Sequence, residues 1–321
     1  MAAATPSTEG RIPFDAPNAG KPAETWYKAQ LTSVQIVGSL DSLTPPLIAL
    51  HGGPGAGHRY LTSLVDLYDK YKIPIIFYDQ IGCGNSTHFR EKPGDTTFWT
   101  FELFCAELDN LVDHFGLREK GFYLLGQSWG GMLAGAYAAR SGAVGLKKLV
   151  ISSGPASMPL FAKGLRRLLA QLPEDVRTVI EDCERRGDYE SPEFEKAAAV
   201  FYARHVCRLD PYPDAVANAF ENLKDDPTVY HTMQGPSEFI VVGSFKDWEG
   251  WKDAHKIQVE TLLLNGRYDE VTDLTVDPWF QTIPRVRWVT LENSSHMSHW
   301  EDRERFMEVV GSFLAGPALE G

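Results

Sequence analysis

One serine, Ser128, lies in the stretch Gly-Gln-Ser-Trp-Gly-Gly, residues 126–131. An apolar run typical of a buried strand precedes it, and a run of small residues typical of a helix follows. A serine in the sharp turn between a strand and a helix has an exposed hydroxyl beside backbone N–H groups that favour negative charge. Glycine at positions 126 and 130 removes side chains that would clash with the neighbouring strand and helix. The pattern predicts that Ser128 is the nucleophile of an acyl transfer; the alternative is a glycine-rich turn that serves only close packing.

A serine nucleophile needs a histidine as general base and a carboxylate that orients this histidine. Where the serine lies between a strand and a helix, the acid follows it in the chain and the histidine comes last. The segment LLLNGRYDEVTD (262–273) ends a predicted strand and offers Asp269 or Glu270. We favour Asp269 as the acid, because a turn after Tyr268 places it just past the end of the strand.

The segment LENSSHMSHWED (291–302) follows the next predicted strand and offers His296 or His299 as the base. We favour His296, because it follows the strand sooner. His299 is the reserve candidate, and its alternative is a surface position at the start of a helix, beside Trp300. Two histidines three residues apart in a tight turn cannot both reach the serine hydroxyl, so we expect a single base.

Two backbone N–H groups must stabilise the negative oxygen of a tetrahedral intermediate. One is predicted at Trp129, the residue after the nucleophile. The other is predicted at Gly53, within LHGGPGAGHRY (50–60), where glycines let the backbone approach a substrate closely. We expect His51 to order this loop by hydrogen bonding rather than to take part in catalysis. The alternative for the whole stretch is a rigid turn.

Strands and helices must alternate to position these side chains. Short apolar runs predict buried strands, and apolar residues at steps of three and four predict helices. The predicted strands cover 46–50, 73–79, 121–126 and 147–153, with one or two more within 26–38, and the predicted helices cover 97–116 and 129–140. Such alternation indicates an α/β fold, in which helices cover both faces of a mostly parallel sheet.

The alternation stops at residues 154–255, which are predicted to be helical and irregular. Strands return at 257–266 and 286–294, and a closing helix follows at 302–314. The predicted organisation is a loose N-terminal arm (1–24), an α/β core (25–153 and 256–321) and a helical cap (154–255). An insertion at the carboxyl end of a strand lies over the place where open α/β sheets bind ligands.

The composition narrows the classes of function. The 321 residues include 43 acidic and 31 basic side chains, for a net charge of −12. This charge argues against nucleic acid and anionic membranes as partners, since both attract basic patches. The four cysteines form no C-x-x-C pair, so we expect free thiols. We find no secretory signal, membrane span, cofactor motif or metal-binding cluster in the sequence, and we expect a cytoplasmic protein without a cofactor. Its oligomeric state is not predicted.

Five stretches together resemble the proline iminopeptidase family of α/β-hydrolases, closest to its tricorn-interacting aminopeptidase branch. They are HGGPG (51–55), FYDQIGCGNS (77–86), GQSWGG (126–131), GRYDEVT (266–272) and SHMSHWED (295–302). The stretch VYHTMQGPSEFIVVGSFKDW (229–248) is similar to the cap of that branch. The resemblance extends from about residue 26 to 315 and implies a serine exopeptidase that removes an N-terminal residue, often proline, from short peptides.

The resemblance also implies roles for individual residues. The triad is then Ser128, Asp269 and His296, with oxyanion donors at Gly53 and Trp129. Glutamates that bind the free α-ammonium of the substrate are implied at Glu238 and Glu270, with a tyrosine at Tyr230 near the same amino end. Gln234 departs from the asparagine common before Gly-Pro in the family. An amino-acid amidase, an esterase or lactonase, and a biosynthetic tailoring hydrolase on the same scaffold remain alternatives.

Overall fold

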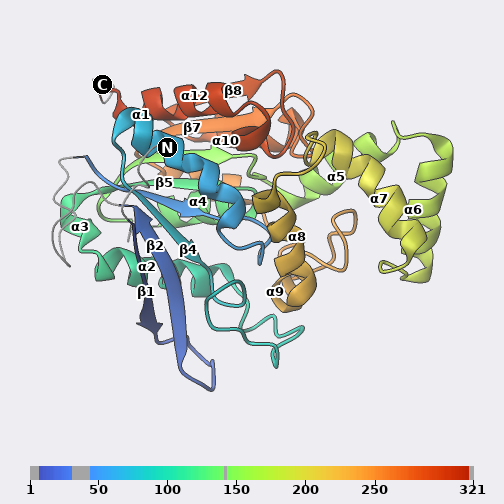
Figure 1. The fold of residues 1–321 in the computed structure, drawn as a ribbon, viewed down its shortest axis with the longest axis horizontal. Helices are drawn as coiled ribbons and strands as arrows, with labels where there is room; N and C mark the ends of the chain where they lie inside the picture. The colour runs from blue at the N-terminus through green and yellow to red at the C-terminus, as the bar shows by residue number, and fades with distance from the viewer. Residues whose placement is uncertain (1–6, 31–43, 141–142, 318–321) are drawn as a thin grey trace.

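An eight-stranded sheet forms the centre of the protein in the computed structural model, which describes residues 7–30, 44–140 and 143–317 (Figure 1). The strand order is β1-β2-β4-β3-β5-β6-β7-β8. β1 and β2 run antiparallel to their neighbours, and the other six strands are parallel. The bounds are β1 (Ser7–Phe14), β2 (Ala23–Gln30), β3 (Leu47–Leu50), β4 (Ile75–Asp79), β5 (Phe122–Gln127), β6 (Leu146–Ser152), β7 (Glu260–Gly266) and β8 (Val286–Leu291). The prediction of a mostly parallel sheet is confirmed.

The prediction of a loose arm over residues 1–24 is wrong for β1. This strand pairs with β2 along its length, from Ser7 opposite Gln30 to Phe14 opposite Ala23. Ile12 and Phe14 point to one side of the strand and are buried. Their burial, which is supplied by the sheet and by helix α2 (Phe101–His114), stabilises a segment whose own composition is polar and rich in glycine and proline. Of the strands predicted within 26–38, residues 31–38 lie outside the described residues.

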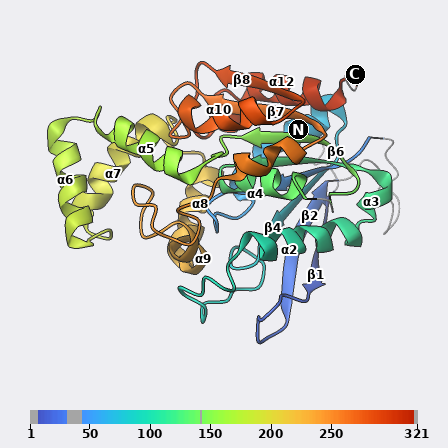
Figure 2. The same ribbon diagram turned by 180° about the vertical axis from the view of Figure 1, so that it is seen from behind.

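Helices cover both faces of the sheet. Helix α1 (Val65–Tyr71) packs against α12 (Arg303–Ala315) on one face, and α2 packs against α4 (Trp129–Ala138) on the other (Figures 1 and 2). Helix α10 (Asp273–Thr282) contacts β7 and β8. Strands β3, β4 and β5 are buried along their whole length between these layers and are mostly apolar, as expected for central parallel strands.

The segment between β6 and β7 is helical, as the sequence predicts. It holds α5 (Met158–Leu169), α6 (Glu174–Arg186), α7 (Pro192–His205), α8 (Asp214–Asp225), α9 (Thr228–Met233) and the 3₁₀ helix η2 (Gly250–Lys256). Helices α6 and α7 project away from the sheet in both views (Figures 1 and 2). Helix α8 packs against the 3₁₀ helix η1 (Arg59–Leu64), which follows the HGGPG stretch. We call residues 154–255 the cap.

All four cysteines, at positions 83, 105, 183 and 207, are buried free thiols, as expected. Within the described ranges, no helix combines the length and the apolar character that crossing a membrane requires.

Candidate active site

Ser128 occupies the strained turn that its glycine neighbours indicate. It lies between β5 and α4 with φ 57° and ψ −124°. A Cβ atom on Gly126 would lie 1.9 Å from the carbonyl oxygen of Gly130, and one on Gly130 would lie 2.2 Å from that of Leu50. Both positions therefore require glycine, because backbone atoms of β3 and α4 occupy the space. The turn places Ser128 at the amino end of α4, where the helix dipole stabilises negative charge.

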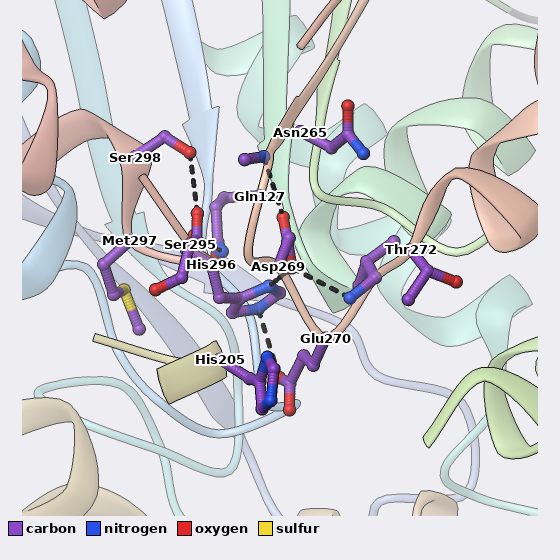
Figure 3. A network of polar contacts seen from close by, with 12 residues as sticks. Gln127, His205, Asn265, Asp269, Glu270, Thr272, Ser295, His296, Met297 and Ser298 are labelled. Carbon is purple, nitrogen blue, oxygen red and sulfur yellow. Dashed lines mark hydrogen bonds and ion pairs between the residues drawn. The ribbon is translucent and has the colours of Figure 1, made fainter. Parts of the chain in front are cut away.

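Asp269 and His296 form a buried hydrogen-bonded pair at the carboxyl ends of β7 and β8 (Figure 3). Nδ1 of His296 lies 2.8 Å from Oδ1 of Asp269 and donates to it, since a carboxylate can only accept. The same carboxylate accepts the backbone N–H of Val271 at 2.8 Å and that of Gly266 at 3.3 Å. These bonds fix the tautomer of the imidazole, whose Nε2 is then available as a base.

The surroundings of His296 favour its protonated form. Burial alone would lower its pKa, but the charge and the hydrogen bond of Asp269, with the charges of Glu238 and Glu301, outweigh burial and raise it. A base with a raised pKa accepts a proton more readily, although it also becomes protonated, and thus inactive as a base, at a higher pH.

The loop that contains Gly53 lies against Ser128. A Cβ atom on Gly52 would lie 2.9 Å from Cβ of Ser128, so the backbone passes directly beside the serine. Within the part of the chain that the structure describes, the N–H groups of Gly53 and Trp129 donate to no protein acceptor. Both groups are thus available to a ligand. The Trp129 side chain is buried, and its indole N–H donates to Oε1 of Gln80 at 2.9 Å.

His51 holds this loop, as predicted from the sequence. Its Nε2 accepts the backbone N–H of Gln80 at 3.0 Å, so its Nδ1 carries the proton and donates to the carbonyl of Gly52 at 3.0 Å. Burial lowers the pKa of His51 to about 4, which keeps the ring neutral. Because the Gly52 carbonyl and the Gly53 N–H share one peptide plane, the bond from His51 orients the Gly53 donor.

Two buried carboxylates, those of Glu238 from the cap and Glu270 from the loop after β7, lie near the pair. The hydroxyl of Tyr230 donates to Oε2 of Glu238 at 2.6 Å. Oε1 of Glu270 lies 3.7 Å from Nε2 of His296, and its Oε2 is buried without a partner among the described residues. Burial and the charges of Glu238 and Asp269 raise the pKa of Glu270 well above its usual value. Burial also raises that of Glu238.

These groups open into one cavity of about 350 Å³ between the core and the cap. Gly53, Ser128 and His296 from the core line it together with Glu238, Glu270 and Tyr230. Tyrosine and phenylalanine side chains of α7 and α8 form much of the remaining wall. The cavity therefore combines a serine hydroxyl, an imidazole and two buried carboxylates in a space with many apolar side chains, which suits a small substrate with a cationic end.

Comparison with known proteins agrees with this geometry. The family model described as "alpha/beta hydrolase fold" matches residues 45–303. The proline iminopeptidase of Saccharolobus solfataricus is 40% identical over 268 residues, which are 84% of this chain and 84% of that protein. The chain belongs to the proline iminopeptidase family of α/β hydrolases. The resemblance to this family that the five stretches indicated is confirmed, and so is the predicted fold class.

Two crystal structures of other proteins are similar to this protein over nearly its whole length. That of VinJ is 43% identical with a TM-score of 0.88, and the alignment covers 96% of this chain and 98% of VinJ. That of the proline iminopeptidase from Mycobacterium smegmatis is 38% identical with a TM-score of 0.85, with coverages of 96% and 97%. The similarity extends through the cap as well as the core, because it covers all but a small part of the chain.

The surface position considered for His299 is wrong. His299 is buried, and its Nε2 donates to the carbonyl of Tyr60 at 3.0 Å. Burial lowers its pKa to about 3, so the ring is neutral. Trp300 donates to the same carbonyl at 2.6 Å. His299 thus holds η1 in place, whereas His296 is the histidine that pairs with Asp269.

Sequence reasoning missed how the cap is joined to the loops that carry Glu270 and His296. The carbonyl of His205, the last residue of α7, accepts the backbone N–H of Glu270 at 3.2 Å and that of His296 at 3.3 Å. The Nδ1 of the same histidine donates to the carbonyl of Tyr268 at 2.8 Å. Nothing in the local sequence of α7 signals these bonds, since their partners lie more than sixty residues away.

One group of side chains within the described chain has the spacing of a metal site. Cys183, Asp188 and Glu193 offer ligand atoms within 4.8 Å of one another. Arg186 is placed among them, with Nη2 at 3.4 Å from Cys183 Sγ and 3.8 Å from an Asp188 oxygen, and it also pairs with Glu193. A guanidinium already supplies the positive charge there, so we interpret the group as an ion-pair cluster.

Proposed function

We propose that the protein is a serine aminopeptidase, which releases an N-terminal proline or another small or apolar residue from short peptides or aminoacyl amides through an acyl-enzyme. The relatives named proline iminopeptidase support this activity. The observation that carries the proposal is the pair of buried carboxylates, Glu238 and Glu270, beside the Asp269–His296 pair. Among the described residues, Oε2 of Glu270 is buried without a hydrogen-bond partner, and burial of such an oxygen costs free energy unless a cation binds it.

In the proposed reaction the α-ammonium of the substrate binds Glu238 and Glu270, and Tyr230 holds the first of them in position. The scissile carbonyl then lies at Ser128, with its oxygen toward the N–H groups of Gly53 and Trp129. Charge-assisted hydrogen bonds of this kind are short and directional, so they fix the distance from the amino end to the reacting carbon.

His296 takes the proton of Ser128 as the oxygen of the serine attacks the carbonyl carbon, and Asp269 stabilises the imidazolium that forms. The tetrahedral intermediate collapses when His296 protonates the leaving amine. Water then attacks the acyl-enzyme, with His296 as base, and releases the N-terminal residue. No cofactor is required by these steps, because the chain supplies nucleophile, base and oxyanion donors.

The cap, residues 154–255, is proposed to enclose the amino end of the substrate. Because Oε1 of Glu270 lies 3.7 Å from Nε2 of His296, an α-ammonium bound to Glu270 leaves room for one residue before the scissile bond. We therefore expect exopeptidase and not endopeptidase activity. We also propose that the protein works in the cytoplasm, since its four free thiols suit a reducing compartment.

An esterase or lactonase on the same scaffold is the second candidate, but no particular observation in this cavity favours it. An ester without an amino group would leave both glutamates buried without a cation. The names of the similar relatives also favour the peptidase.

The test compares an aminoacyl arylamide with its N-acetylated form, using wild-type protein and Ser128→Ala. We expect wild type to cleave the free-amine substrate and to leave the acetylated one essentially intact. Ser128→Ala should fold normally and lose several orders of magnitude in kcat, as other enzymes do without their nucleophile. Equal cleavage of both substrates would contradict the ammonium requirement, and near-normal activity of folded Ser128→Ala would contradict the mechanism.

A further inference from the structure

A buried chain of hydrogen bonds connects the three loops of the candidate site. The backbone N–H of Gly52 donates to the hydroxyl of Tyr60 at 2.6 Å. This hydroxyl donates to Oε1 of Gln127 at 2.6 Å. Nε2 of Gln127 donates to the carbonyl of His296 at 3.1 Å. The chain therefore runs from the loop of the oxyanion donor, past the residue before the nucleophile, to the base.

Each hydrogen bond of this network has a defined donor and acceptor. The Tyr60 hydroxyl has a single proton, which Gln127 accepts, so its lone pair is available to Gly52. The amide of Gln127 is oriented by both ends, because its oxygen faces a donor and its nitrogen faces a carbonyl. Burial raises the pKa of Tyr60, which keeps the proton on the hydroxyl.

The tyrosine itself is fixed from the other side. Tyr60 is 1% exposed, and its carbonyl accepts hydrogen bonds from both His299 and Trp300, which follow His296 in the sequence. Gly52 is held at both ends of the residue as well, since its N–H is bound by Tyr60 and its carbonyl by His51. The positions of the oxyanion loop and the base loop thus depend on the same aromatic side chain.

We propose that Tyr60 is a positioning residue for hydrolysis, whose hydroxyl holds the Gly53 oxyanion donor through Gly52, and Ser128 and His296 through Gln127, in one mutual arrangement. This inference rests on the proposed function, because it assigns Tyr60 to the same reaction. Tyr60 lines the cavity but acts on the reaction through Gly52 and Gln127. Because these hydrogen bonds hold the Gly53 donor through Gly52, their effect falls on the transition state, where the oxyanion is present.

The test is Tyr60→Phe, which removes one oxygen and keeps the ring. We expect kcat on an aminoacyl arylamide to fall roughly ten- to a hundredfold, as for small displacements of catalytic groups, while KM changes little. Tyr78→Phe is the matched control. Tyr78 is fully buried in β4, and within the described residues its hydroxyl has no hydrogen-bond partner, so its loss should leave kcat unchanged.

Three readouts separate positioning from a general loss of structure. Active sites are counted by the stoichiometry of a fluorophosphonate that labels the nucleophile, and kcat is expressed per labelled site. The inhibition constant of an aminoacyl boronic acid, which forms a tetrahedral adduct, should rise by about the factor by which kcat falls. The inhibition constant of the free amino acid product should stay the same.

A second variant, Gln127→Met, breaks the chain at its next member with little change in volume. If the hydrogen-bond chain acts as a unit, kcat of the double variant should be no lower than kcat of the more damaged single variant. The effects of substitutions within one network are not additive.

Several results would overturn the inference. One is an unchanged kcat per labelled site in Tyr60→Phe, with only fewer sites, which indicates a structural role. Another is a raised KM with normal kcat, which indicates a substrate-binding residue. A third is full additivity with Gln127→Met. The proposed function fails separately, when wild-type protein itself does not cleave the free-amine substrate.

Discussion

Replacing Glu270 by glutamine keeps the shape of the side chain and removes its charge. Glu270 is buried, with one oxygen 3.7 Å from Nε2 of His296 and the other unpartnered among the described residues. If this carboxylate binds the substrate ammonium, the variant loses an attraction in a site that water enters poorly. If the site takes a neutral ester, the variant loses nothing.

The magnitude follows from the separation of the charges. Two unit charges about 3 Å apart attract by roughly 5 kcal/mol at an effective dielectric constant of about 20. Removal of water from the ammonium offsets part of this, and truncation of one partner of buried charge pairs typically costs about 2–5 kcal/mol. Converted at about 1.4 kcal/mol per factor of ten, kcat/KM should fall about 30- to 5,000-fold.

The assay measures kcat/KM of wild type and Glu270→Gln on an aminoacyl arylamide and on a simple acetate ester. In Glu270→Gln, kcat/KM should fall for the aminoacyl arylamide and stay unchanged for the acetate ester. Glu195→Gln is the matched control, because Glu195 lines the same cavity but its side chain is 61% exposed and pairs with Lys224. The kcat/KM of Glu195→Gln should stay within a few-fold of the wild-type value, because exposed ion pairs contribute little free energy.

Equal losses on the arylamide and the ester would refute the reasoning, since they indicate a general defect of the triad. No loss on the arylamide would refute it as well and would leave the esterase as the better reading. A loss in Glu195→Gln as large as that in Glu270→Gln would indicate that overall negative charge, rather than this carboxylate, attracts the substrate.

Three further predictions concern other groups. His296→Ala should lose several orders of magnitude in kcat, whereas His299→Ala should lose at most about tenfold, because Trp300 still holds the Tyr60 carbonyl. Glu238→Gln should move the acid limb of the kcat/KM profile on an ester to lower pH, because the charge of Glu238 raises the pKa of His296. Burial raises the pKa of Glu107 from 4.5 to about 8, so its contribution to stability is present below pH 4.5 and is lost as pH rises through 8. The free energy of unfolding of Glu107→Gln, from urea titrations at pH 5 and 9, should therefore fall less with pH than that of wild type, by up to several kcal/mol.

Each of these has an outcome that contradicts it. A larger loss in His299→Ala than in His296→Ala would make the assignment of the base wrong. An acid limb that stays in place or moves upward in Glu238→Gln would mean that Glu238 does not act on His296. Parallel pH dependences of stability in wild type and Glu107→Gln would mean that Glu107 is ionised in the folded protein throughout this range.

Local sequence determined the parts of this protein that depend on neighbours in the chain. The turn at Ser128 is an example, because strand, glycine spacing and helix all lie within about twenty residues. The central strands were predictable for the same reason, since a fully buried strand must be apolar along its length. His51 was correctly predicted to order its loop, since a histidine beside two glycines has the loop's own carbonyls within reach.

Only the tertiary structure decided the features that depend on distant partners. Strand β1 has just two buried apolar side chains near its end, Ile12 and Phe14, and it forms because β2 and α2 cover it. His299 is buried because η1 brings the carbonyl of Tyr60 to it across 239 residues of chain. The hydrogen bond from Tyr60 to Gln127 was likewise not predictable from the sequence. Histidine, tyrosine and glutamine side chains also occur at protein surfaces, and only packing removes them from water and makes hydrogen-bond partners necessary.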